Sequence, residues 1–258
     1  MKLAITVVVL LLLAVAATTG LSFTEAQSPT GVLRIRVRVK SSDSAPLRGF
    51  ARKRFYLIPG SLEQNRTLVE AIDRQQLISR DCYYRELGAS QALMQWLRDG
   101  ECESVYCREV EKEFITGPKP VPEFAAAYAA SQKEFGGDDT AQKWITTNLD
   151  PKIRDGFYKY RQTAIETLLK QASGTVLSVM TDRNGTAYFT ELGPGTYVLS
   201  SVVPTELDQT IVNWNCEVQV KPGDLATEKP YLLSNRKDRL VKCVAVEKLL
   251  PPCPEPVK

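Results

Sequence analysis

Residues 181–201 read TDRNGTAYFTELGPGTYVLSS, and this stretch decides the fold class of much of the chain. The pair Asn184-Gly185 supplies the positive φ values that tight turns between strands require. Alternating polar and apolar residues follow, and the Gly193-Pro194-Gly195 corner precedes a second apolar run. The stretch therefore predicts a β-hairpin, a tight corner and a further strand.

A second stretch with strand character lies near the N-terminus. Residues 33–40 read LRIRVRVK, so four apolar side chains face one side and four cations face the other. This alternation predicts a half-buried strand of an antiparallel sheet. We expect further strands at 54–58, 175–181, 186–190, 196–203, 211–220 and 229–233.

The pattern changes to that of helices between residues 61 and 173. Ser61 and Gln64 have the spacing of a capping box, which marks a helix start. After them, apolar residues recur at intervals of three and four, as on one face of a helix. The expected helices within this region include 91–98, 107–114, 122–135 and 151–172.

The N-terminus reads as a secretory signal of bacterial type. Lys2 precedes an apolar run over residues 3–17, which is shorter than the ~20 residues of a membrane span. Cleavage after Ala16 or after Ala26 fits the small-residue rule, and no cysteine follows the run to carry a lipid anchor. We expect a secreted or periplasmic protein with no membrane span once the signal is removed.

Composition excludes several functions. The 258 residues are 43% hydrophobic and 24% charged, with a net charge of +3 that is too small to argue for a nucleic-acid partner. The chain has no histidine, which excludes Ser-His-Asp and Cys-His nucleophiles and histidine-bearing zinc sites. We therefore expect no catalytic residues, no metal and no cofactor, and a protein that is not an enzyme.

Six cysteines in an exported chain indicate disulfides. Cys102 and Cys107 are close enough to form a local bridge, with Cys82 as a competing partner for either. Cys216 is expected to pair with Cys243, although Cys253 could close on Cys243 instead.

Residues 181–201 also resemble the carboxypeptidase regulatory-like domains, which are transthyretin-like (prealbumin-like) sandwiches. The resemblance is carried by these residues: Thr181, Asp182, Gly185, Ala187, Phe189, Leu192, Pro194, Gly195 and Tyr197. It implies a core position for Phe189 and Leu192, and a core ring for Tyr197 whose hydroxyl reaches a partner near the rim. Such domains are attached to many secreted proteins, so the resemblance implies a fold more than a function.

The related collagen-adhesin B-type repeats carry a Lys–Asn isopeptide crosslink that an acidic residue assists. The matching acidic position falls near Ser200 and Ser201, where this chain has no acid. We therefore expect no crosslink here.

Together these patterns predict an α+β protein: a seven-strand Greek-key β-sandwich of the prealbumin-like kind, interrupted by an α-helical insertion. The expected segments are a signal peptide over 1–26, sandwich parts over 27–60 and 174–235, the insertion over 61–173, and a Cys/Pro-containing tail over 236–258.

Two sets of residues are candidate binding sites. The cationic strand face could bind an anionic polymer, although a solvated face paired with acids of the insertion would explain the same residues. Aromatics flanked by carboxylates could line a sugar-binding or sugar-processing cleft, although a helical core with surface acids would also explain them. The cations are Arg34, Arg36, Arg38 and Lys40, and the aromatics are Tyr83, Tyr84 and Trp96.

The function expected from the sequence is that of an exported, non-enzymatic structural or protein-interaction module. Binding of carbohydrate or of a bacterial envelope polymer is the alternative, and a carboxylate-dependent hydrolase is the third reading. The partner, a protein or an envelope polymer, is not identified by the sequence.

Overall fold

The computed structural model describes residues 30–223 and 229–253. The expected signal peptide lies outside the described residues. Within them, no helix is both long and apolar enough to cross a bilayer. The fold is α+β: strands form the two ends of the described chain, and all the described helices lie between β3 and β4 in sequence.

The first sheet is built around β1 (Gly31–Val39), as its alternating sequence predicts. β1 pairs antiparallel with β5 (Thr186–Leu192) and β2 (Arg48–Gly49), and parallel with β10 (Tyr231–Ser234). β11 (Cys243–Val244) extends the sheet beyond β10. Ile35, Val37 and Val39 of β1 are fully buried, so the cations that alternate with them lie on the opposite, outer face.

The second sheet is antiparallel and packs against the buried face of the first. Its order is β4 (Leu177–Met180), β3 (Arg54–Pro59), β6 (Gly195–Ser200) and β9 (Asn215–Val220). The core between the sheets is centred on the buried Trp214, whose ring lies 6.0 Å from that of Phe50 and 5.6 Å from that of Phe55.

The turn at residues 182–185 connects the two sheets and does not form the expected hairpin. β4 pairs with β3, whereas β5 pairs with β1, so the chain crosses from one sheet to the other at this turn. The Asp182 carboxylate accepts hydrogen bonds from the backbone N–H groups of Asn184 and Thr186, both at 2.8 Å. The hairpin expectation was wrong because a tight turn fixes the local backbone, but not which neighbours its strands choose.

A third, small sheet contains β7 (Thr205–Leu207), β8 (Thr210–Asn213) and β12 (Val246–Leu249). The expected strand 211–220 is therefore split: β8 belongs to this sheet and β9 to the second sheet, with Trp214 between them. The α+β class is confirmed. The seven-strand Greek-key arrangement is not confirmed, because the described strands are divided among three sheets.

Two helices cover the outer face of the second sheet. α2 (Arg66–Arg74) and α7 (Phe157–Leu169) pack on it through a separate apolar cluster that includes Ile58, Ile72 and Leu168. The capping-box hydrogen bonds form, since Ser61 and Gln64 bond each other's backbone N–H groups, although helix α2 itself begins at Arg66.

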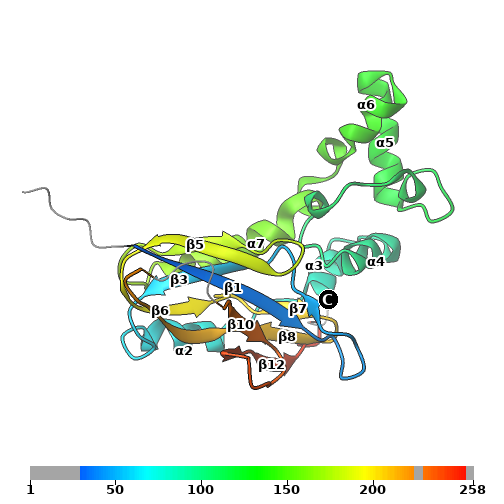
Figure 1. The fold of residues 1–258 in the computed structure, drawn as a ribbon. Coiled ribbons are helices and arrows are strands. Elements are labelled where there is room, and N and C mark those ends of the chain that lie inside the picture. Colours follow the sequence, from blue (N-terminus) through cyan, green and yellow to red (C-terminus); the bar gives the residue numbers. More distant parts are fainter. Residues whose placement is uncertain (1–29, 224–228, 254–258) are drawn as a thin grey trace, which may run out of the picture.

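The remaining helices form a second core of their own. They are α3 (Arg80–Glu86), α4 (Gln91–Asp99), α5 (Pro122–Phe135) and α6 (Asp138–Lys143). Short turns named η1 (Val105–Cys107), η2 (Lys112–Phe114), η3 (Ile145–Asn148) and η4 (Lys152–Gly156) connect them. Figure 1 shows α5 and α6 projecting away from the sheets, and we call this pair the arm.

The expected helix over 107–114 is wrong. Only the short turns η1 and η2 form in this region. Cys107 is held by a disulfide to Cys102, and the backbone of Arg108 is extended, so a continuous helix cannot pass through this point.

Candidate functional site

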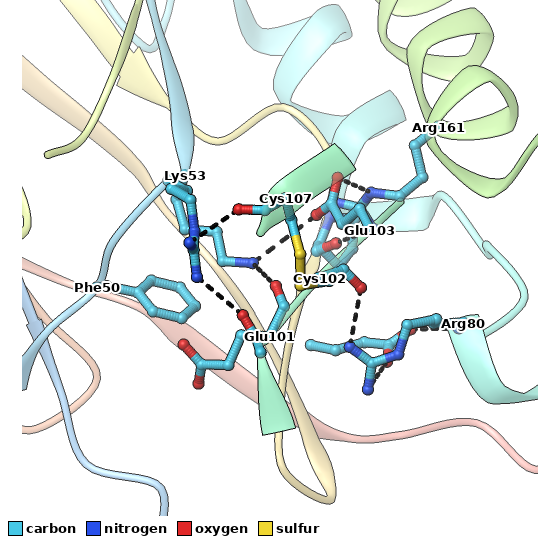
Figure 2. Close-up of polar contacts among 12 residues, drawn as sticks. Phe50, Lys53, Arg80, Glu101, Cys102, Glu103, Cys107 and Arg161 are labelled. Carbon is cyan, nitrogen blue, oxygen red and sulfur yellow. Dashed lines mark hydrogen bonds and ion pairs between the residues drawn. A yellow bond between two sulfur atoms is a disulfide. The ribbon is translucent and has the colours of Figure 1, made fainter. Parts of the chain in front are cut away.

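Six ionisable side chains meet where the helices join the sheets, and we call them the ionic junction; Figure 2 labels all of them except Glu206. They come from the segment before β3, from α3, from the loop after α4, from α7 and from β7. Three are cations and three are carboxylates. They are Lys53, Arg80, Arg161, Glu101, Glu103 and Glu206.

Glu103 lies between two of the cations. Its carboxylate is 3.4 Å from Arg161 Nε and 3.9 Å from Lys53 Nζ. Burial alone would raise the pKa of Glu103, but Arg161, Lys53 and Arg80 together hold that pKa below its usual value. Glu103 is therefore a stable anion at neutral pH and a poor proton donor.

Lys53 is buried, with 7% of its surface exposed. Its Nζ donates to the Glu101 carbonyl oxygen at 3.3 Å and lies 5.2 Å from the centre of the Phe50 ring. Burial lowers the pKa of Lys53, and the nearby carboxylates of Glu103 and Glu101 offset part of that effect.

The other two carboxylates are each matched by an arginine. The Glu101 carboxylate accepts hydrogen bonds from both terminal guanidinium nitrogens of Arg48. Glu206 accepts the Arg80 backbone N–H at 2.5 Å and lies 3.7 Å from its guanidinium. Burial raises the pKa of Glu206, and Arg80 opposes that rise. Each carboxylate of the junction thus has at least one cationic partner.

The Cys102–Cys107 disulfide closes the loop that carries Glu103. Arg52, from the sandwich, donates to the carbonyl oxygens of Gly100 and Cys107, each at 3.0 Å. These bonds fasten the loop to the sheets and so position Glu103 against Arg161.

Two further disulfides join distant segments of the chain. Cys216 pairs with Cys243, which links β9 to β11 across the two facing sheets. Cys82 of α3 pairs with Cys253 of the tail, a pairing that the sequence did not predict. Disulfides of this kind indicate an oxidising compartment outside the cytoplasm.

A cleft of about 490 Å³ opens beside the ionic junction, between the 101–107 loop, β3 and α7. We call it the junction cleft. Lys53, Glu103 and Arg161 contribute to its lining. Tyr106 and Tyr158 also line it, with 56% and 38% of their surfaces exposed.

The three aromatics expected to form a sugar-binding groove do not do so. Tyr84 and Trp96 are fully buried in the core of the helical region, and Tyr83 is half-buried against Tyr84 and Phe157. The expectation of binding residues is wrong for Tyr84 and Trp96, because a helical core of this size needs large apolar side chains at its centre.

The cationic face of β1 lies on the outside of the first sheet. Arg34, Arg36, Arg38 and Lys40 are half-buried, and none of them forms an ion pair with a carboxylate of the described chain. Arg34 instead lies over the ring of Tyr188, at 5.8 Å from its centre. In the described part of the chain, no ion pair joins an acid of the helical region to these four side chains.

Sequence reasoning missed Lys53 and Arg161, although each carried a signal. Arg161 lies four residues after Phe157 and seven before Leu168, so it falls on the buried stripe of its helix. Lys53 lies two residues before Phe55 and four before Leu57, so by the alternation of a strand its side chain points to the same buried face as theirs. A cation on an apolar face is the pattern that would have found both.

A second exposed feature lies on the arm. Phe135, at the end of α5, and Trp144, after α6, have ring centres 6.4 Å apart. They are 41% and 47% exposed. Over the described ranges, no three His, Cys, Asp or Glu side chains are grouped closely enough to hold a metal ion.

No protein-family model and no curated protein sequence matches the chain. Among solved structures, a candidate carbohydrate-binding protein from Pseudomonas aeruginosa matches 81% of this chain and 90% of its own, at 14% identity and a TM-score of 0.26. The RrgB pilus backbone of Streptococcus pneumoniae matches at 12% identity and a TM-score of 0.21. That match covers 74% of this chain and 35% of RrgB. At these TM-scores, neither likeness bears on the fold or the function.

Proposed function

We propose that the chain is an exported, non-enzymatic interaction module that binds a protein partner through its arm. In this proposal the sandwich parts, 27–60 and 174–235, are a rigid base, and the insertion, 61–173, presents the binding surface. The observation that carries the proposal is the exposed pair Phe135 and Trp144 on a projecting part of the molecule (Figure 1).

The arm has the physical character of a recognition element. It is anchored to the helical core, where the ring of Phe124 of α5 lies 5.0 Å from that of Trp96. Aromatic side chains are enriched at protein interfaces, because they bury a large area on binding. Two exposed rings on one support therefore favour a protein partner.

We also propose that the two facing sheets are a diverged regulatory-like sandwich. Three strand residues of the motif behave as that resemblance implies: Phe189 and Leu192 are buried, and the Tyr197 hydroxyl donates to the Gly193 carbonyl at 2.8 Å. Gly185 adopts a φ of +75°. These features support the proposed family assignment.

The arm proposal is tested by affinity capture from the envelope fraction of the source organism. We expect the wild-type chain to capture a partner that Phe135→Ala/Trp144→Ala does not. Tyr188→Ala is the matched control, since Tyr188 is a comparably exposed ring on the first sheet. Equal capture by the wild type and by the arm variant would refute the proposal.

A second candidate function is binding of an anionic envelope polymer by the arginines of β1. It is favoured by the lack of carboxylate partners for Arg34, Arg36 and Arg38 within the described chain. Alternate residues of a strand are ~6.8 Å apart, so the row presents regularly spaced positive charge. Exchanging all three for Glu should abolish salt-sensitive retention on an anionic polymer column.

The matched control for the polymer experiment reverses three exposed lysines elsewhere: Lys133, Lys152 and Lys170. It changes the net charge equally but leaves β1 intact. If both triple variants lose retention to the same extent, binding follows total charge, and the arginine row is not a specific surface.

The junction carboxylates support binding over hydrolysis. The void that Glu103 and Glu206 line together is only about 10 Å³, far below the few hundred Å³ of small-molecule sites, so no substrate can lie between these two carboxylates. A glycosidase also needs a carboxylic acid that is protonated near neutral pH at the reacting bond. The cations beside Glu103 hold its pKa low. Burial raises the pKa of Glu206, but this carboxylate does not line the junction cleft.

A further inference from the structure

The junction cleft has the features of a ligand site that the arm proposal does not use. We propose that it binds a sugar that carries a carboxylate. Its volume of about 490 Å³ is in the range of small-molecule sites. Lys53 and Arg161 in its lining are each less than a tenth exposed, so charged groups are held in place at the base of the cleft.

The charges at the rim call for an anionic ligand. Arg52 and Arg54 line the cleft and are exposed. Arg52 donates to two backbone carbonyls and Arg54 to the Ser178 hydroxyl at 3.2 Å, and neither pairs with a carboxylate within the described ranges. Guanidinium groups bind carboxylates with two parallel hydrogen bonds.

Glu103 supplies acceptors for hydroxyl groups. Its carboxylate is 29% exposed and is held by ion pairs of 3.4 and 3.9 Å, longer than the ~2.8 Å of a strong charge-assisted hydrogen bond. A carboxylate has about four lone-pair sites. Glu103 therefore retains acceptor capacity for the hydroxyls of a ligand.

The two exposed tyrosines supply an apolar surface beside these polar groups. Tyr106 comes from the disulfide-closed loop and Tyr158 from α7, so they line the cleft from different elements. A sugar ring has an apolar C–H face and a rim of hydroxyls. A tyrosine ring can pack on the C–H face of the sugar while its own hydroxyl forms a hydrogen bond with a sugar hydroxyl. The tyrosine rings, the acceptor sites of Glu103 and the guanidinium groups without a carboxylate partner together match the groups of an acidic sugar.

The backbone at the cleft is unusually strained. Among the described residues that are not glycine, positive φ occurs at Arg52 (55°), Glu101 (51°), Glu191, Val202 (61°) and Asp208. Arg52 and Glu101 line the cleft, and Val202 lies between two lining residues, Ser201 and Val203. Such conformations are held by their surroundings and concentrate at binding sites.

The test is calorimetric titration of the full chain, with its disulfides formed, using glucuronic acid, oligogalacturonate, glucose and maltotriose. We expect the acidic sugars to bind at least tenfold more tightly than their neutral counterparts. Tighter binding of oligogalacturonate than of glucuronic acid identifies a polymer end as the source, and equal binding identifies a free sugar. Acetate should not compete at equal concentration.

Variants assign the binding to the cleft. Tyr106→Ala/Tyr158→Ala should weaken binding of acidic sugars at least tenfold, while Tyr188→Ala should leave it unchanged. Arg54→Gln should weaken binding of acidic but not of neutral sugars, with the exposed Arg183→Gln as its control.

Three outcomes would overturn the inference: no binding of acidic sugars at about 10 mM, equal binding of acidic and neutral sugars, or binding that survives the paired tyrosine change. Phe135→Ala/Trp144→Ala should leave sugar binding intact. Failure of the arm proposal is thereby distinguished from failure of this one.

Discussion

Gly185 is the residue on which the connection between the facing sheets depends. Its φ is +75°, and a Cβ added there would lie 2.2 Å from the Val37 carbonyl oxygen. Its own carbonyl accepts the Val37 N–H at 2.7 Å. The turn therefore packs directly on β1, where there is no space for a side chain.

Gly185→Ala should lower the free energy of unfolding by more than about 2 kcal/mol. The left-handed backbone alone costs about 1–2 kcal/mol for alanine, and the contact with Val37 adds to that cost. Gly88→Ala is the control, because Gly88 has a φ of +72° but no atom within 4 Å of the added Cβ. Urea denaturation would check both, and equal costs would rule out the packing explanation.

Tyr56 makes stability depend on alkaline pH. Burial raises its pKa to about 12 from the ordinary value of 10.0. The unfolded chain ionises first as pH rises, so the stabilisation is complete below pH 10 and is lost as pH rises from 10 towards 12. At pH 11, the wild type should have lost about 1 kcal/mol more than Tyr56→Phe, relative to pH 8.

The Tyr56 prediction compares the loss of unfolding free energy in two proteins, so the titration of groups that both proteins share cancels. Tyr188→Phe serves as the control, since Tyr188 is exposed. If Tyr56→Phe follows the wild type between pH 8 and pH 11, the phenol does not cause the alkaline loss.

Among the elements, the disulfides differ most in the length of chain that they close. Cys82 and Cys253 are 171 residues apart, whereas Cys102 and Cys107 are five apart. Loop-closure entropy predicts that exchanging the first pair for Ser costs about 5 kcal/mol and the second about 2 kcal/mol. Urea denaturation of the two paired variants would check this order, which equal or reversed costs would contradict.

The regular elements could be predicted because their sequence patterns are local. The alternation of β1 and the apolar stripe of α5 placed both elements within two residues of their bounds. The partners of β4 and β5 could not be predicted, because strand pairing depends on contacts between residues far apart in sequence. The ionic junction could not be predicted for the same reason, because it brings Lys53 together with Glu103 and Arg161, about fifty and one hundred positions later in the sequence.

The candidate aromatics illustrate a second limit. Tyr84 and Trp96 look the same in sequence as Tyr106 and Tyr158, yet the first two are buried and the second two line the junction cleft. Periodicity places a residue on a face of its helix. It does not say whether another element covers that face, and only the packed fold decides which aromatics reach solvent.

For the whole molecule, the ionic junction joins the helical part to the sheets. Arg161 of α7 contacts Glu103 and also donates to the Pro204 carbonyl at 2.7 Å, so it touches the 101–107 loop and the sheet side together. The Cys82–Cys253 disulfide makes a second connection between the two parts, since it ties α3 to the tail that follows β12. We therefore expect the sheets and the helices to unfold in one transition.

Arg161→Met should cost about 3 kcal/mol, because it leaves the partly buried Glu103 carboxylate with one described ion-pair partner, Lys53, at 3.9 Å. Adding Glu103→Gln should restore part of the loss, since the unpaired charge is then gone, and the coupling in a double-mutant cycle should be about 1–3 kcal/mol. The matched control is the exposed pair Arg66 and Glu63, whose coupling should stay below about 1 kcal/mol. Additive effects at the junction would mean that Arg161 acts through its packing and its hydrogen bond to Pro204, and not through Glu103. A second unfolding transition in Arg161→Met, absent from the wild type, would identify the ionic junction as the contact that makes the two parts unfold together.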